Sequence, residues 1–200
     1  MILIIIWTIT YKIFVEKLEI WKPYVFPSPK DVWETLVFLT KDYSIIFGII
    51  TSLQRLVIGF FISIIIGMSL GVIIVRFEYL RTNFRDMVLG LQTLPSVAWI
   101  PFAILWFGLT ESTIIFVIAI GSIFAIATAT EDGIRNVNPI FLKAAKTMGI
   151  KGKNLYFKVI FPAALPMIVS GMKQGWSFAW RALMAGEMLV GTKGLGYILM

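Results

Sequence analysis

The sequence has 200 residues, 58% of them hydrophobic and 14% charged, and it carries a formal net charge of +7. A soluble domain is about half apolar and about a quarter charged, so this composition excludes an ordinary soluble protein. The absence of cysteine and histidine also excludes disulfides, thiol chemistry and histidine-ligated metals. We therefore expect no catalytic residue and no metal site in this chain.

Long runs without charge indicate that the chain crosses a membrane several times. No charged residue occurs in 56–75, 87–110 or 112–130, and a helix needs roughly 20 apolar residues to cross the hydrocarbon core. We predict an all-α membrane protein, a polytopic transmembrane helical bundle. About five spans are expected, at 1–15, 44–75, 87–108, 112–130 and 162–191. Pro95 and Pro101 fall inside the third span and predict a kink or a break there.

The connecting segments predict the domain organisation and the orientation. Residues 1–43 are expected to hold a first span or its remnant and an external amphipathic segment, and residues 44–200 the transmembrane domain. Segment 131–162 carries six basic residues against two acids, and the loop predicted at 76–86 carries three more basic residues. Basic residues mark the cytoplasmic side, so both segments should face the cytoplasm and segment 16–43 should face outward. Charges confined to such segments also argue against a nucleic-acid partner.

Small residues recur at helical spacing in two of the predicted spans. In 44–75 they are spaced every four residues, at Gly59, Ser63, Gly67 and Gly71. In 162–191 the same spacing joins Gly171 and Gly175. Such stripes let two helices approach closely in a membrane, so we predict helix packing at both. A moving helix contact that lines a pathway is the alternative.

The basic segment 131–162 predicts two short helices. Asn138 and Pro139 form a good helix start, and Gly149 suits the left-handed position just after a helix end. A second helical piece is expected at 154–161, before Pro162. Two short helices on the cytoplasmic side suggest a platform for a cytoplasmic partner; an ordinary return of the chain to the membrane is the alternative.

The same segment resembles the cytoplasmic signature of the permease subunits of binding-protein-dependent ABC importers. That signature is Glu-Ala-Ala-x₃-Gly-x₉-Ile-x-Leu-Pro, and its spacing is kept throughout in this sequence. The matching positions are Lys143, Ala144, Ala145, Gly149, Val159, Phe161 and Pro162. Lys143 stands where the signature has Glu, and Val159 and Phe161 are mild replacements. The resemblance implies that this loop is the coupling helix, which docks on an ATP-hydrolysing subunit.

Further short strings are similar to one branch of that family, the permeases for nitrate, sulfonates, taurine and some vitamin precursors. They are Phe26-Pro27-Ser28-Pro29, Ser52-Leu53-Gln54-Arg55, Leu94-Pro95-Ser96-Val97-Ala98-Trp99, Ala185-Gly186-Glu187-Met188 and Gly194-Leu195-Gly196. The resemblance implies the fold of a type I ABC importer permease in a prokaryotic inner membrane. Members of the family usually have one more span after the Gly-Leu-Gly string, so a sixth span is expected to be missing from this sequence.

The resemblance also implies partners and a function for the chain. The partners are a second permease subunit in a homodimer, cytoplasmic ATP-binding subunits, an external solute-binding protein and the lipid bilayer. ATP and Mg would be bound in the partner ATPase, and this chain is expected to bind no cofactor and to be no enzyme. The solute is expected to be a small anion such as a sulfonate, taurine or nitrate. A neutral or heterocyclic vitamin precursor, or a secondary transporter outside the ABC class, is the alternative.

Polar residues within the predicted spans are candidates for lining the pathway, because charges at membrane depth usually face a bundle interior or a cavity. The candidates are Arg55, Lys173, Gln174, Arg181 and Glu187. Arg55 has two alternatives, an ion pair or a side chain that extends to the membrane surface. For the others the alternatives are contacts with neighbouring spans and with lipid headgroups.

The predicted orientation can be tested by labelling, because the chain has no native cysteine. Lys151→Cys and Lys30→Cys are expected to differ toward an impermeant thiol reagent in intact cells. Position 30 should react and position 151 should be protected, since the more basic segment faces the cytoplasm. Reaction at 151 with protection at 30 would reverse the topology.

Overall fold

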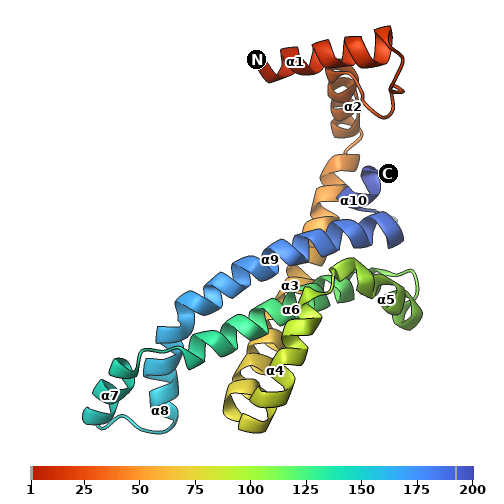
Figure 1. The fold of residues 1–200 in the computed structure, drawn as a ribbon. Helices are drawn as coiled ribbons and strands as arrows, with labels where there is room; N and C mark the ends of the chain where they lie inside the picture. The colour runs from red at the N-terminus through yellow and green to blue at the C-terminus, as the bar shows by residue number, and fades with distance from the viewer. Residues whose placement is uncertain (1, 192) are drawn as a thin grey trace. The chain divides into compact units, whose positions relative to one another are not determined.

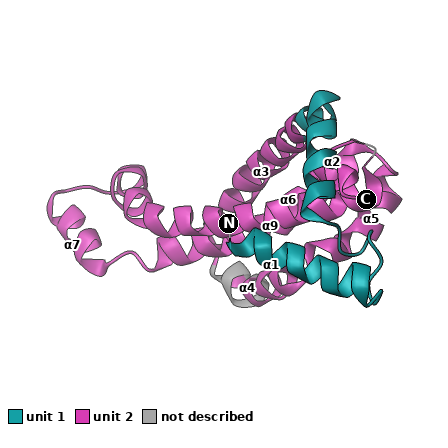
Figure 2. Ribbon diagram, turned by 90° about the horizontal axis from the view of Figure 1, so that it is seen from above, with its two compact units in different colours: residues 1–48 teal, residues 49–200 magenta. Residues whose placement is uncertain are grey.

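The structure of the chain, a computed structural model, describes residues 2–191 and 193–200, and the side chains of all of these except residues 78 and 80–84. The described residues form helices joined by short loops, with no strand among them, which confirms the all-α prediction (Figure 1). The chain divides into two compact units, residues 1–48 and residues 49–200 (Figure 2).

The first unit contains α1 and α2. α1 spans Ile2–Tyr11 and continues as a π-helical turn over Lys12–Lys17, and α2 spans Pro29–Lys41. α2 begins at a capping box, in which Ser28 Oγ accepts the N–H of Asp31 and the Asp31 carboxylate accepts the N–H of Ser28. The amphipathic segment predicted in this region therefore contains a capped helix.

The second unit is built around α6. Its elements are α3 (Ser44–Arg76, whose first residues belong to the first unit), α4 (Glu78–Thr93), a 3₁₀ turn (Ser96–Trp99), α5 (Ile100–Phe107), α6 (Glu111–Arg135), α7 (Pro139–Thr147), α8 (Lys153–Leu155), a π-helical turn (Tyr156–Ile160), α9 (Phe161–Val190) and α10 (Leu195–Ile198). α6 and α9 lie side by side, with α7 and α8 at one end of the pair and α5 and α10 at the other (Figure 1). α6 is central, since most of its apolar side chains are buried.

Three described helices are long and apolar enough to cross a membrane, and a bent pair of helices forms a fourth span if the two count as one. The three are Ser44–Arg76, Glu111–Arg135 and Lys153–Val190, which match the second, fourth and fifth predicted spans. The first predicted span, 1–15, is helical but short. Residues 2–17 extend about 24 Å at 1.5 Å per residue, less than the roughly 30 Å of the hydrocarbon core. The described residues thus supply up to four of the spans expected.

The third predicted span is broken, as its prolines indicated. Arg85–Thr93 and Ser96–Phe107 meet at an angle of 99°. The break lies at Pro95, which has no N–H to donate and disfavours helical backbone at Leu94, where ψ is 130°. Pro101 causes no break, because it lies in the first turn of α5, where a missing N–H leaves no hydrogen bond unmade.

Two of the predicted loop boundaries are wrong. The segment 76–86 is not a loop, because α4 already begins at Glu78. The charged residues keep this segment out of the hydrocarbon core, but they do not prevent it from forming a helix. No glycine or proline occurs in residues 78–89. The segment predicted as a cytoplasmic loop from residue 131 also begins inside a helix, since α6 continues to Arg135. The piece expected at 154–161 is helical and runs directly into α9.

The two stripes of small residues contact α6 from two sides. A Cβ atom added to Gly67 on α3 would lie 2.9 Å from Cβ of Ile126, and one added to Gly175 on α9 would lie 3.0 Å from Cγ1 of the same residue. Ile126 therefore fills the space that the two glycines leave. The other members of the stripes also contact α6 closely: Gly59, Ser63, Gly71 and Gly171. The close approach predicted from the spacing is present at both stripes.

Gly71→Ala is expected to destabilise this packing. The added Cβ would lie 2.6 Å from the carbonyl oxygen of Ala127, a backbone atom that moves only if α6 shifts. Overpacking of this kind lowers the free energy of unfolding by about 1–3 kcal/mol. The melting temperature in nanodiscs, followed by tryptophan fluorescence, should fall. Gly90→Ala is the control, because nothing lies within 4 Å of a Cβ there; equal melting temperatures would contradict close packing of α3 on α6.

Candidate functional site

The segment between α6 and α9 presents a short, capped helix. Asn138 Oδ1 accepts the N–H of Ile140 at 2.9 Å, and Pro139 occupies the first turn of α7, as the sequence predicted. Gly149 follows the helix end with φ 78°, the left-handed conformation that was expected there. Residues at or next to each end of α7 therefore determine where this helix begins and ends.

α7 is anchored on one side only. Ala145 is buried, and Leu142 packs against an apolar cluster at the base of α9. Three large apolar side chains on or just after α7, Ile140, Phe141 and Met148, are each more than half exposed. This face has no covering segment among the residues that the structure describes.

The positions that resemble the coupling signature lie on both arms of the segment. Lys143, Ala144 and Gly149 are exposed on and just after α7. Val159 and Phe161 are half-buried where the π-helical turn enters α9, and Pro162 beside them is exposed. The signature thus marks a hairpin whose return arm is anchored while its outer helix is accessible.

A charged cluster at the same end of α6 was not singled out from the sequence. Arg85 on α4 contacts two carboxylates of α6, Glu131 at 3.1 Å and Asp132 at 3.0 Å, and Arg135 lies 3.9 Å from Glu131. These pairs join α4 to α6 just before the chain enters α7. No group of three or more histidine, cysteine or acidic side chains suited to a metal ion occurs in the described part of the chain.

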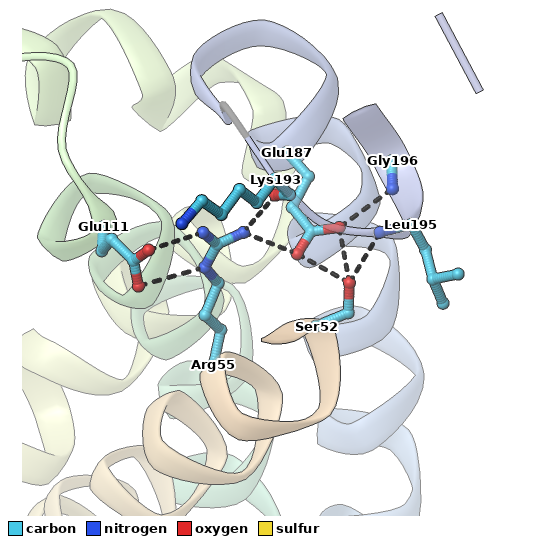
Figure 3. Close-up of polar contacts among 7 residues, drawn as sticks. All are labelled: Ser52, Arg55, Glu111, Glu187, Lys193, Leu195 and Gly196. Carbon is cyan, nitrogen blue, oxygen red and sulfur yellow. Dashed lines mark hydrogen bonds and ion pairs between the residues drawn. The ribbon is translucent and has the colours of Figure 1, made fainter. Parts of the chain in front are cut away.

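Glu187 lies at the centre of a buried polar cluster at the other end of the α6–α9 pair (Figure 3). Its carboxylate is fully buried. Oε1 accepts from Nη1 of Arg55 at 2.9 Å, and Ser52 Oγ lies 2.8 Å from both carboxylate oxygens. Oε2 accepts the N–H of Gly196 at 2.9 Å. Both oxygens of this carboxylate therefore accept hydrogen bonds within the cluster.

Arg55 and Ser52 extend the cluster to three further residues. Arg55, only 3% exposed, donates to the carbonyl of Lys193 at 2.7 Å and pairs with Glu111 at 2.8 Å. Ser52 Oγ accepts the N–H of Leu195 at 2.9 Å. The cluster therefore connects α3, the first residue of α6, the end of α9 and the segment that leads into α10 (Figure 3).

This placement corrects the expectation that Arg55 and Glu187 line a pathway. Both are buried and paired, because an unpaired charge at membrane depth is costly. Ion pairing was the alternative for Arg55, and the structure shows it. Glu111 was not singled out. Ser52, Glu187 and Gly196 could have been grouped, because each lies in one of the strings that resemble the permease family.

The other three pathway candidates, Lys173, Gln174 and Arg181, are exposed on α9. Arg181 lines a cleft of 350 Å³ beside the break between α4 and α5. Lys173 lies about 12 Å from Arg181 along the helix, toward α8. The structure thus separates the five candidates into a buried pair and an exposed group.

The chain is similar to known transport proteins over most of its length. Residues 59–200 match the family model described as "Binding-protein-dependent transport system inner membrane component". A protein of Methanocaldococcus jannaschii that is named as an ABC transporter permease is 34% identical over 78% of this chain and 59% of its own length.

Two further relatives have names that state a solute. The nitrate import permease protein of Synechocystis is 30% identical over 76% of this chain and 55% of its own length. The taurine transport system permease protein of Escherichia coli is 25% identical over 92% of this chain and 69% of its own length. The chain therefore spans between about half and about two thirds of the relatives that it matches.

Glu187→Gln is expected to loosen the buried polar cluster. A glutamine places an NH₂ group where an oxygen now accepts, so this group would face Arg55 or the N–H of Gly196. Removing one partner of a buried ion pair costs about 3–5 kcal/mol. We expect a lower melting temperature and faster tryptic cleavage after Lys193, whose carbonyl the cluster holds.

The control for this variant is Glu34→Gln. Glu34 pairs with Lys30 at 3.6 Å on the exposed surface of α2, and such pairs contribute little to stability. If both variants melt and are cleaved like the unmodified protein, the cluster is not what holds the segment after α9.

Proposed function

The chain belongs to the family of binding-protein-dependent transport system inner membrane components, and we propose that it forms the membrane pathway for a small solute in an ABC importer. It is a multi-pass inner-membrane protein. In this proposal an external binding protein delivers the solute, and a second copy of the permease completes the pathway. Cytoplasmic subunits that bind ATP and Mg supply the energy, so this chain is a transport subunit and not an enzyme.

The observation that carries the proposal is the exposed apolar face of α7. A helix of nine residues is marginal by itself in water, and α7 is anchored only through its inner side. Its caps at Asn138 and Gly149 fix its length, while Ile140, Phe141 and Met148 face outward. Short helices with such a face typically dock in an apolar groove of a partner protein. We propose that the partner is the ATP-binding subunit, as the resemblance to the coupling signature implies.

Lys143 determines the charge that its ion-pair partner in the docking groove must carry. It is exposed on α7, where the signature has an acidic residue. An ion pair at this position therefore requires an acidic residue on the ATP-binding subunit, the reverse of the pair that a glutamate would make. This is a constraint on the partner subunit of this permease.

The proposed solute is a small anion. The relatives above are named for nitrate and for taurine, which carries a sulfonate group. Nitrate and sulfonate share a compact oxyanion, and the basic balance of the chain is compatible with an anionic cargo.

Gly149→Val is expected to uncouple the permease from ATP hydrolysis. Nothing lies within 4 Å of a Cβ at Gly149, so the side chain has room, and the cost comes from the backbone, which has φ 78°. Left-handed backbone costs about 1–2 kcal/mol for an ordinary residue, and more for a β-branched one. That is enough to misplace a short helix without affecting the spans. Solute-stimulated ATP hydrolysis by the reconstituted complex should be lost while membrane insertion is unchanged.

Gly90→Val is the matched control for this experiment. Gly90 also has open space around it but lies within α4, where valine is a better helix former than glycine. This variant should retain full stimulation. Full stimulation in Gly149→Val as well would mean that α7 is an ordinary connection and that the coupling assignment is wrong.

A further inference from the structure

We propose that the cleft beside the break between α4 and α5 binds the oxyanion group of the solute, with the guanidinium of Arg181 as its cation. This inference rests on the proposed function, because it names the chemistry of a site on the pathway. It distinguishes Arg181 from the other polar residues of the spans, and it assigns a selectivity to the permease itself.

The cleft has the polarity of an anion site. It has a volume of 350 Å³, and it is lined by residues 92–97, Gly121, Phe178 and Arg181. Gln92, Thr93, Ser96 and Arg181 supply its polar groups. No acidic side chain lines it, so the charge of Arg181 is not neutralised there.

Arg181 is held in place by contacts that leave most of its guanidinium available. Its Nε donates to the carbonyl of Ser177 at 3.1 Å, and its guanidinium lies 4.9 Å from the centre of the Phe178 ring. No carboxylate of the described residues pairs with it. The two terminal nitrogens therefore present an unused pair of donors, the geometry that binds two oxygens of an oxyanion.

The depth of the cleft in the membrane argues that it contains water. Arg181 lies nine residues before the end of α9, and Gly121 lies ten residues after the start of α6. At 1.5 Å per residue both lie about 14–15 Å inside the ends of helices that are long and apolar enough to cross a membrane. An unpaired arginine is rarely stable there against lipid, so it is expected to face a polar cavity.

Two other side chains complete the set of donors. Gln92 is oriented by Thr128, whose Oγ1 lies 3.1 Å from the Gln92 side-chain oxygen. Gln92 lines the cleft, and its side-chain amide carries two N–H donors. Ser96 adds a hydroxyl from the other side of the break. Because Pro95 ends α4 between them, Gln92 and Ser96 reach the same cleft from two differently directed segments.

Gly121 brings Ser96 close to α9. A Cβ at Gly121 would lie 3.1 Å from Cβ of Ser96 and 3.5 Å from Cβ of Ala182, the residue that follows Arg181. Any larger residue on α6 would push the broken segment away from α9. The close packing therefore places the Ser96 hydroxyl and the Arg181 side chain on one cleft.

The test uses the absence of native cysteine in the chain. Ser96→Cys places one thiol in the cleft of the full chain in membrane vesicles. Its reaction rate is measured with an anionic reagent, sulfonatoethyl methanethiosulfonate, and with a cationic one, trimethylammonioethyl methanethiosulfonate. Both transfer their group to the thiolate with loss of methanesulfinate, so the ratio of the two rates cancels the ionisation of the thiol and reports the local potential.

We expect the anionic reagent to be favoured, and the ratio to fall by about tenfold or more when Arg181→Gln is added to Ser96→Cys. Arg181→Lys should keep most of the ratio, because it keeps the charge. Millimolar nitrate or ethanesulfonate should slow the anionic reagent when Arg181 is present and not in the Arg181→Gln background. Lys173→Gln is the matched control on the same helix and should leave the ratio unchanged.

Three results would overturn the proposal. The thiol at position 96 could fail to react with either reagent, which would mean that the cleft is closed to water. The ratio could be the same with and without Arg181, or it could fall equally in Lys173→Gln, which would indicate a general surface charge. The assay requires neither ATP nor a binding protein, so its failure is distinguishable from failure of the ATP-hydrolysis experiment on Gly149.

Discussion

The buried carboxylate of Glu187 is the constraint on which one end of the helical bundle, the end away from α7, depends. In a membrane no water is available to solvate it, so its oxygens must be satisfied by the protein. Arg55, Ser52 and the N–H of Gly196 do this, and they come from α3 and from the segment after α9. Arg55 also forms an ion pair with Glu111, the first residue of α6, and so links the cluster to that helix. One buried charge therefore links α3, the start of α6, the end of α9 and the segment that leads into α10.

The same three helices are also close-packed along their length. The small residues of α3 and α9 meet α6 at contacts too close for a side chain, with Ile126 between Gly67 and Gly175. A block that is clamped at one end and close-packed along its length behaves as a unit. The bent pair α4–α5 and the exposed helix α7 lie outside this block. The proposed anion cleft is formed between the block and the bent pair, and the proposed coupling helix is α7.

The features that local physics determines could be predicted from the sequence, and those that depend on distant partners could not. The long apolar stretches predicted the positions of α3, α6 and α9. Asn138 and Gly149 predicted the ends of α7. Both kinds of feature are determined by residues that are close together in the sequence. The helix over residues 78–86 was missed, because charged residues indicate that a segment lies outside the lipid and do not indicate that it is not helical. The pairing of Glu187 with Arg55 joins residues 132 positions apart.

The contrast between Arg55 and Arg181 shows why the structure, and not the residue type, assigns the two roles. Both are arginines within spans, and the sequence treats them as equivalent pathway candidates. Arg55 is buried between two carboxylates, so its charge is neutralised locally and an approaching anion would gain little from it. Arg181 has an aromatic ring and a backbone carbonyl as neighbours, which orient it without cancelling its charge. A cation can attract a solute only where the protein has not already supplied the counter-charge, and of these two arginines only Arg181 meets that condition.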